Sequence, residues 1–323
     1  MHKQLPTWLL IQNSLQQNIE VMLLYVLESR GSSPGRQGFF MAVNATGEMS
    51  GSLGGGIMEH KFVEMAKSKL KQAAGERSVH QQLHDKQAAK NQSGMICSGE
   101  QTIFLYTLQP QDAATAGLLI QSMQQNKNGT LQLSPAGISF VENIPPADFS
   151  FEINADADFI YREKTGYKNY LYIIGGGHCA LAFSQLMSGM DFYIQLFDDR
   201  AGLLTIDQNH FVQECKLLEN YKDLTELIPS GKNNYVVIMT VGYRTDELAL
   251  KALLGKDFKY FGILGSKNKI VKMFENLVRE GIAPDLLDRI HAPIGLSIKS
   301  QTTEEIAVSI AAEIILVKNR ELV

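Results

Sequence analysis

Cysteine is scarce in this chain, and its distribution excludes a disulfide framework. The 323 residues contain three cysteines, Cys97, Cys179 and Cys215, and no two of them form a C-x-x-C pair. Such a content is typical of a reducing compartment, so we expect a cytoplasmic protein. The same spacing argues against a structural zinc site, and the sequence predicts no metal centre held by protein ligands.

Long apolar runs, a secretion signal and a basic block are also missing. No apolar stretch reaches the roughly 18 residues of a membrane helix. The segment MHKQLP at residues 1–6 lacks the basic and apolar parts of a signal peptide. The formal net charge is −4 and lysine and arginine are not clustered, which gives no support for nucleic-acid binding. We therefore expect neither a membrane nor a nucleic-acid partner.

The chain does have the length and apolar content for two cores. Hydrophobic residues make up 45% of it and charged residues 20%, as in ordinary globular proteins. Single cores rarely grow beyond about 250–300 residues. We predict an N-terminal domain over residues 1–165 and a C-terminal domain over residues 166–323, with the boundary near residues 162–169.

A glycine turn in the C-terminal half gives the clearest motif. The segment YLYIIGGGHCA (170–180) predicts a buried strand, a turn and a helix, and Gly175, Gly177 and Ala180 fit the pattern G-x-G-x-x-A. Phosphate would lie at the N-terminus of that helix, where free N–H groups and the helix dipole favour an anion. His178 opens the helix. It is equally well explained as a donor to the ligand or as a helix-terminal histidine without a ligand.

An acidic pair follows at the spacing that this motif requires. Asp198 and Asp199 end the next predicted strand, about 20 residues after the glycines, where dinucleotide-binding folds place an acid on the ribose. An acid there favours NAD or another adenosine ligand over NADP, although the neighbouring Arg200 weakens the preference.

Strands and helices alternate from residue 170 onward, which predicts a parallel α/β sheet. Strands are expected at 170–174, 192–197, 212–217, 235–240 and 259–264, and helices at 178–188, 245–254, 266–280 and 303–318. A T-x-x-E capping box at Thr302 opens the last helix.

Two further turns at strand ends are candidates for the same ligand crevice. Gly265, Ser266 and Lys267 form a second glycine turn before a helix, in which Ser266 is the expected N-cap. The segment TVGYRTD (240–246) follows another strand. Simple helix capping with solvated side chains is the alternative for each turn, but two such turns in one sheet favour a crevice for an anionic ligand.

The N-terminal half predicts a mixed arrangement of helices and strands with its own glycine-rich turn. Strands are expected at 20–27, 39–43, 79–84 and 101–108, and helices at 7–19, 57–73 and 113–124. An anion or a pterin-like ligand could bind a set of cations, glycines and an acid, or the glycines could simply shape a hairpin and a helix start. This set consists of Arg30, Arg36, Gly54, Gly55, Gly56 and Glu59. From its chemistry alone, Cys97 is best interpreted as a buried small residue.

Taken in order, these segments resemble the XdhC/CoxI family, the accessory proteins of xanthine and carbon monoxide dehydrogenases. The resemblance spans residues 28–310 and rests on ESRGSSP (28–34), GSLGGG (51–56) with Glu59, CSG (97–99), GGGHCA (175–180), DDR (198–200), FGILGSK (261–267), HAPIGL (291–296) and TEEIAVSI (303–310). It implies a C-terminal Rossmann-like parallel sheet with helices on both faces, preceded by a mixed α+β XdhC/CoxI domain.

The resemblance also implies a function and a set of site residues. The family's role is to bind molybdenum cofactor, in molybdopterin or dinucleotide form, assist its sulfuration and deliver it to a molybdenum hydroxylase of the xanthine dehydrogenase class. Cys97 then becomes a candidate molybdenum or sulfur ligand. A cysteine desulfurase and a second copy of the chain, in a homodimer, are the further partners implied.

Three departures from the family pattern are visible. Ser98 stands where members often carry glycine, Gly176 replaces an alanine, and TVGY (240–243) lacks the histidine that many members have after the threonine. Two alternatives to the accessory role are an NAD-dependent oxidoreductase and a non-catalytic nucleotide-sensing module. We find no convincing acid/base set for hydride transfer in the sequence.

Overall fold

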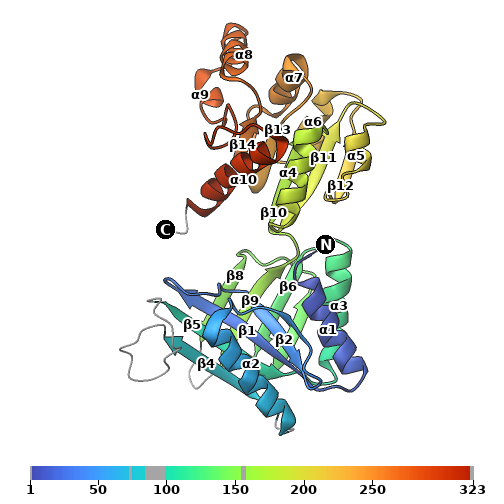
Figure 1. Ribbon diagram of the computed structural model, residues 1–323, viewed down its shortest axis with the longest axis vertical. Coiled ribbons are helices and arrows are strands. Elements are labelled where there is room, and N and C mark those ends of the chain that lie inside the picture. The colour runs from blue at the N-terminus through green and yellow to red at the C-terminus, as the bar shows by residue number, and fades with distance from the viewer. Residues whose placement is uncertain (1, 73–74, 84–98, 154–157, 321–323) are drawn as a thin grey trace. The chain divides into compact units, whose positions relative to one another are not determined.

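The computed structural model describes residues 2–72, 75–83, 99–153 and 158–320. They form two compact units, residues 1–166 and residues 167–323, and each unit is described by itself. Figure 1 shows the order of the elements along the chain.

The N-terminal unit is built on a five-stranded antiparallel sheet in the order β3-β2-β1-β5-β4. Its strands are β1 (Val21–Arg30), β2 (Phe40–Asn44), β3 (Met49–Gly51), β4 (Arg77–Leu83) and β5 (Glu100–Thr107). The central strand β1 is buried along its first seven residues. Its side chains alternate between two cores, because successive residues of a strand point to opposite faces.

Helices cover both faces of this sheet. Helix α2 (Gly56–Lys71) packs on one face through Met58, Phe62 and Ala66. Helices α1 (Leu5–Gln16) and α3 (Asp112–Gln124) contribute to the core on the other face, where Trp8 is fully buried. The unit therefore buries a strongly apolar strand from both sides.

A second sheet of four antiparallel strands completes this unit, in the order β7-β6-β9-β8. Its strands are β6 (Gly129–Ser134), β7 (Gly137–Val141), β8 (Phe149–Ile153) and β9 (Phe159–Thr165). The buried Glu163 on β9 accepts hydrogen bonds from Tyr25 on β1 and from Tyr161 (2.9 Å), which joins the two sheets through a polar contact inside the core. Burial raises the pKa of Tyr25, and the nearby Glu163 raises it further.

The C-terminal unit is a five-stranded parallel sheet in the order β12-β11-β10-β13-β14. Its strands are β10 (Asn169–Ile174), β11 (Phe192–Asp198), β12 (Glu214–Leu217), β13 (Gly231–Ile238) and β14 (Phe258–Ile263). The chain adds strands on one side of β10 and then on the other. The strand order therefore reverses between β10 and β13, the place where open α/β sheets bind ligands.

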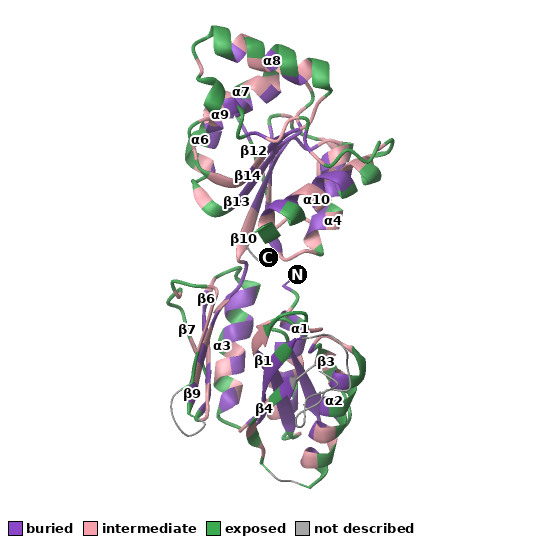
Figure 2. Cartoon of the chain, turned by 90° about the vertical axis from the view of Figure 1, so that its left-hand side faces the viewer, coloured by how far each residue is buried: buried purple, intermediate pink, exposed green. Residues whose placement is uncertain are grey.

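Helices flank both faces of the parallel sheet (Figure 2). Helices α4 (His178–Ser188) and α10 (Thr303–Asn319) form one core with the sheet. Helices α6 (Leu224–Leu227), α7 (Tyr243–Leu253), α8 (Lys267–Arg279) and α9 (Pro284–Leu287) pack on the other face. The short elements α5 (Leu204–Asp207) and η1 (Tyr221–Asp223) lie in the connections around β12.

The predicted fold class is confirmed, and the predicted and observed helices and strands differ locally. Strand β13 begins at Gly231 rather than 235, because Gly231 pairs with Phe258 at the sheet edge although residues 232–234 are polar. The capping box of α10 is present, with Thr302 and Glu305 bonding each other's backbone N–H groups. The sequence also predicts an apolar face on α10 that includes Ile315, but Ile315 is 39% exposed. The three shortest α-helices, α5, α6 and α9, were not predicted, since four residues carry no readable helical period.

Candidate functional site

The floor of the candidate site is the turn after β10, and Gly175 makes it possible. Gly175 has φ +112°, a region that favours glycine. A side-chain carbon there would overlap the backbone of Met239 at the end of β13. Its N–H donates to the carbonyl of Phe197 on β11 (2.7 Å). The turn thus contacts both neighbouring strands at the point where the strand order reverses.

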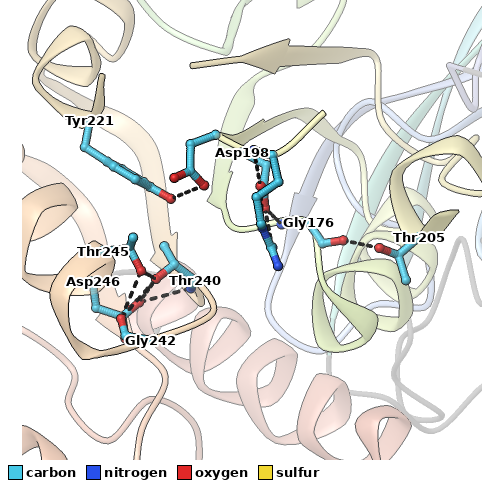
Figure 3. Close-up of polar contacts among 10 residues, drawn as sticks. Gly176, Asp198, Thr205, Tyr221, Thr240, Gly242, Thr245 and Asp246 are labelled. Atoms are coloured by element: carbon cyan, nitrogen blue, oxygen red, sulfur yellow. Dashed lines mark hydrogen bonds and ion pairs between the residues drawn. The ribbon is translucent and has the colours of Figure 1, made fainter. Parts of the chain in front are cut away.

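The next glycines differ in what surrounds them. Gly176 lies against Ile206 of α5, and its carbonyl accepts a hydrogen bond from Thr205 (2.5 Å; Figure 3). Gly177 is the N-cap of α4, and a side-chain carbon added there would meet no atom within 4 Å. The open position is therefore Gly177, as expected for the glycine that lets a phosphate approach the backbone.

The remaining fingerprint residues lie as the motif requires. Ala180 is 1% exposed and packs in the core between α4 and the sheet. His178 is the first residue of α4, and its side chain is exposed. Its part in ligand binding stays a prediction.

Asp198, at the end of β11, is enclosed by donors from the protein itself (Figure 3). Its Oδ2 accepts from the N–H of Gly176 (2.6 Å) and from Nη2 of Arg200 (2.7 Å). Its Oδ1 accepts from Nε and from the backbone N–H of Arg200, both at 2.9 Å. Burial by itself raises the pKa of Asp198, but these hydrogen bonds outweigh it and the pKa lies below its ordinary value.

Asp199 lies in the bend that follows β11 and has a different partner from Asp198. It is exposed and accepts a hydrogen bond from the hydroxyl of Tyr221 in η1 (2.9 Å). Burial raises the pKa of Tyr221, and the bond to Asp199 raises it further. Tyr221 was not among the expected site residues, and nothing in its local sequence marks it.

A buried ion pair connects the loops that follow β13 and β14, on the other side of the site. Asp246 in α7 is fully buried and accepts from the N–H (3.0 Å) and the hydroxyl (2.6 Å) of Thr240. Lys269 in α8 donates its ammonium to Asp246 and to the carbonyl of Leu264 (3.2 Å). The ammonium of Lys269 is thus engaged within the protein.

The second glycine turn is a capped helix start. Ser266 is the N-cap of α8 and accepts from the N–H of Lys269 (3.3 Å). Gly265 lies against the side chain of Lys269, and Lys267 is exposed. The apolar Val241, 71% exposed in the loop after β13, lies at the same carboxyl edge of the sheet. This edge combines an open helix N-terminus with polar and apolar surface, which suits a phosphate-bearing ligand with a ring.

In the N-terminal unit, three glycine-containing segments pack backbone to backbone. A side-chain carbon at Gly35 would overlap the carbonyl of Leu53, and one at Gly99 would overlap the backbone of Ser32. The buried Gln101 donates to the carbonyl of Gly35 (2.7 Å). The structure therefore brings together the predicted segments 28–34, 51–56 and 97–99, the last through Gly99.

Glu59, itself one of the predicted ligand-binding residues, fills the glycine-rich loop before α2. Its Oε2 accepts from the N–H groups of Leu53 (2.7 Å) and Gly55 (3.0 Å) and from the hydroxyl of Ser52 (2.7 Å). Burial raises its pKa, but the hydrogen bonds outweigh it and the pKa is lowered. A carboxylate of the protein thus occupies the position expected for a bound anion, and the N–H of Gly54 bonds Ser52 (3.0 Å).

The two predicted arginines lie at the surface of this unit. Arg30 pairs with Glu28 (2.9 Å), and Arg36 donates to the carbonyl of Gly31 (3.1 Å). A cavity of about 170 Å³ lies where β1, β4 and β5 meet. It is lined by Glu28, Arg30, Gln81, Gln82, Glu100, Gln101, Thr102 and Ile153.

Cys97 lies outside the described residues, and the two described cysteines are poor nucleophiles. Burial raises the pKa of the Cys179 thiol, and the negative charge of Glu304 adds to the shift. Desolvation likewise raises the pKa of Cys215. Within the described ranges, no group of three or more His, Cys, Asp or Glu side chains could hold a metal ion. In that same part of the chain, no helix is both long and apolar enough to cross a membrane.

The segment HAPIGL forms a structural connection to α10. His291 stacks on Tyr260 with ring centres 4.5 Å apart and bonds Glu313 of α10 through Nδ1 (3.0 Å). Glu313 also accepts from the N–H of Gly295 (2.8 Å) and the hydroxyl of Tyr260 (2.5 Å). This set fixes α10 against the edge strand β14.

Comparison with known families finds a matching family profile in each half of the chain. The profile described as the XdhC Rossmann domain matches residues 171–314, and that of the XdhC and CoxI family matches residues 14–81. This chain belongs to the XdhC and CoxI family. The resemblance inferred from the motifs is confirmed.

The curated relatives that match this family member are longer than it is. It is 25% identical over 309 residues to the uncharacterized protein YqeB of Escherichia coli, covering 94% of this chain and 44% of that protein. It is 33% identical over 84 residues to a probable xanthine dehydrogenase subunit of Bacillus subtilis, covering 26% of this chain and 23% of that protein. The chain thus spans less than half the length of the curated relatives it matches.

A solved structure has the same fold. The crystal structure of a xanthine dehydrogenase from Bacillus halodurans superposes with a TM-score of 0.72 at 21% identity. The match covers 97% of this chain and 96% of that one.

Proposed function

We propose that this chain is an accessory protein of a xanthine dehydrogenase-type molybdenum hydroxylase. In this role it binds molybdenum cofactor, assists its sulfuration and delivers it to the enzyme. Membership of the XdhC and CoxI family supports the role, and so does the relative named as a probable xanthine dehydrogenase subunit. A cysteine desulfurase as sulfur donor and a homodimeric state belong to the same proposal.

One observation carries the proposal: the family's separate motifs converge in space. Gly35, the loop at Leu53 and Gly99 pack together in the N-terminal unit, and Gly99 follows Cys97 by two residues. In the C-terminal unit the turn at Gly175 and the loop after β13 meet at the switch point of the sheet. In the proposal the CSG motif contributes the thiol of Cys97, and the C-terminal turn contributes a helix N-terminus suited to a phosphate.

Cys97 is the residue assigned to sulfur or molybdenum chemistry. The other two cysteines have raised pKa values, which keeps them as thiols near neutral pH. A thiolate is a preferred ligand of soft metal centres and the reactive form in sulfur transfer. The role of Cys97 rests on the CSG motif, since the matched family range ends at residue 81.

The cofactor that accompanies the protein tests this function. We expect anaerobically isolated protein to release molybdenum and a pterin, detected by metal analysis and mass spectrometry. Cys97→Ser should lower the molybdenum content at least about tenfold, corresponding to about 1.4 kcal/mol of binding free energy. Cys215→Ser is the matched control and should retain the wild-type content. A Cys97→Ser protein that keeps its cofactor and restores hydroxylase activity as well as wild type would overturn the role of Cys97.

A further inference from the structure

Asp198 occupies the position where a dinucleotide-binding fold places the acid that accepts the ribose hydroxyls. Its carboxylate offers about four lone-pair positions. All four are matched by donors: two backbone N–H groups, from Gly176 and Arg200, and two from the guanidinium of Arg200. Asp198 is 1% exposed. A ribose diol would find no free acceptor there.

We propose that Arg200 is a specificity-determining residue that excludes an unmodified ribose diol from this end of the crevice. Its side chain closes over Asp198 in a bidentate pair, the strongest carboxylate geometry available to an arginine. The crevice therefore discriminates against NAD and ADP-ribose. It favours a phosphate-bearing ligand without a ribose diol at this position. The inference rests on the proposed function insofar as both assign the phosphate-bearing ligand to this crevice.

Two other aspartates could have accepted the ribose hydroxyls in place of Asp198, but each is bonded to other groups of the protein. Asp199 is exposed and accepts a hydrogen bond from Tyr221 (2.9 Å). Asp246, on the other side of the switch point, is fully buried and bonded to Thr240 and Lys269. Ribose recognition in this crevice thus depends on displacing Arg200.

The geometry also predicts what removal of the guanidinium would do. In Arg200→Ala the two backbone N–H bonds to Asp198 remain, so the turn stays fastened. The substitution frees one acceptor position on Oδ1 and one on Oδ2, the pair that a ribose diol requires. Because the variant also loses a positive charge near the phosphate site, nonspecific electrostatics would weaken dinucleotide binding. A gain in affinity would therefore have to outweigh this loss, and the inference attributes it to the uncovered carboxylate of Asp198.

Calorimetric titration of the full chain with NAD and with ADP-ribose tests the inference. We expect weak binding to wild type and at least about a tenfold tighter dissociation constant for Arg200→Ala, as two new hydrogen bonds to a charged acceptor would allow. Arg244→Ala removes an exposed arginine from α7 at the same sheet edge and should give no gain. In the double variant Arg200→Ala/Asp198→Asn the gain should disappear. Thermal unfolding of each variant establishes that it is folded.

Several outcomes would overturn the inference: wild type binding NAD as tightly as Arg200→Ala, no dinucleotide binding by any variant, or a gain that persists without the Asp198 carboxylate. Loss of the proposed accessory role is a separate result, because it is measured by molybdenum content. A protein without molybdenum that still shows the Arg200-dependent gain would refute that role and support the selectivity of Arg200.

Discussion

At the scale of single residues, the glycine turn shows how identical side chains serve different purposes. Gly175 has a positive φ and no room for a side chain, whereas Gly177 has φ −75° and open space. Gly175 is thus required by the fold, and Gly177 is the position left free for a ligand. Sequence spacing identified both glycines; the structure shows the tight turn at Gly175, and phosphate binding at Gly177 stays a prediction.

The two glycines should respond differently to the same substitution. We expect Gly175→Ala to destabilise the protein by about 2–4 kcal/mol, through left-handed backbone strain and overlap with Met239. The unfolding midpoint should fall by about 5–15 °C. Gly177→Ala is the matched control and should leave the midpoint unchanged in a thermal unfolding experiment. Equal shifts for the two variants would contradict this account.

At the scale of elements, Glu59 of helix α2 accepts hydrogen bonds from the glycine loop that precedes the helix and so joins the two. The lowered pKa of Glu59 fixes the sign of the pH dependence. A carboxyl group whose pKa is lower in the folded state stabilises the fold above its unfolded pKa. That contribution is lost as the pH falls through the folded value.

We therefore expect Glu59→Gln to cost about 1–2 kcal/mol of unfolding free energy at pH 7, because the charged acceptor of three hydrogen bonds is removed. The difference from wild type should shrink as the pH falls below the ordinary carboxyl value of 4.5. Urea unfolding at a series of pH values measures it. Glu64→Gln on the same helix removes only an exposed pair with Lys67 and should leave the stability nearly unchanged at every pH. A pH-independent difference for Glu59→Gln would refute the carboxylate's role.

At the scale of the whole molecule, the described apolar clusters keep to one unit each. Two of them draw their members from residues 5–161, and two from residues 171–317. Because each unit has its own buried core, neither depends on apolar contacts from the other unit to hide its strands.

Residues 167–323 produced alone should consequently fold. We expect a single cooperative thermal transition and a circular dichroism spectrum of mixed helix and strand, since the two cores and all five parallel strands lie within this range. Residues 191–323, which lack the central strand β10 and helix α4, serve as the control and should not unfold cooperatively. A gradual, non-cooperative transition for residues 167–323 would contradict the independence of the unit.

The sequence by itself determined the parallel sheet, most element positions, the fingerprint turn and the family. These features are encoded locally, in the period of apolar residues and in glycines at fixed offsets. It missed the short helices and the start of β13, where Gly231 pairs with Phe258 on β14 and the polar Asn234 pairs with Tyr170 on β10.

Only the tertiary structure decided how the site's charges are used. It placed Arg200 on Asp198, Glu59 in the glycine loop and Lys269 on the buried Asp246. Spacing along a chain brings a charge to the correct sheet edge, but its partner depends on which side chains fold against it. The sequence could therefore name Asp198 as the ribose acceptor, and the fold showed that its oxygens are already taken.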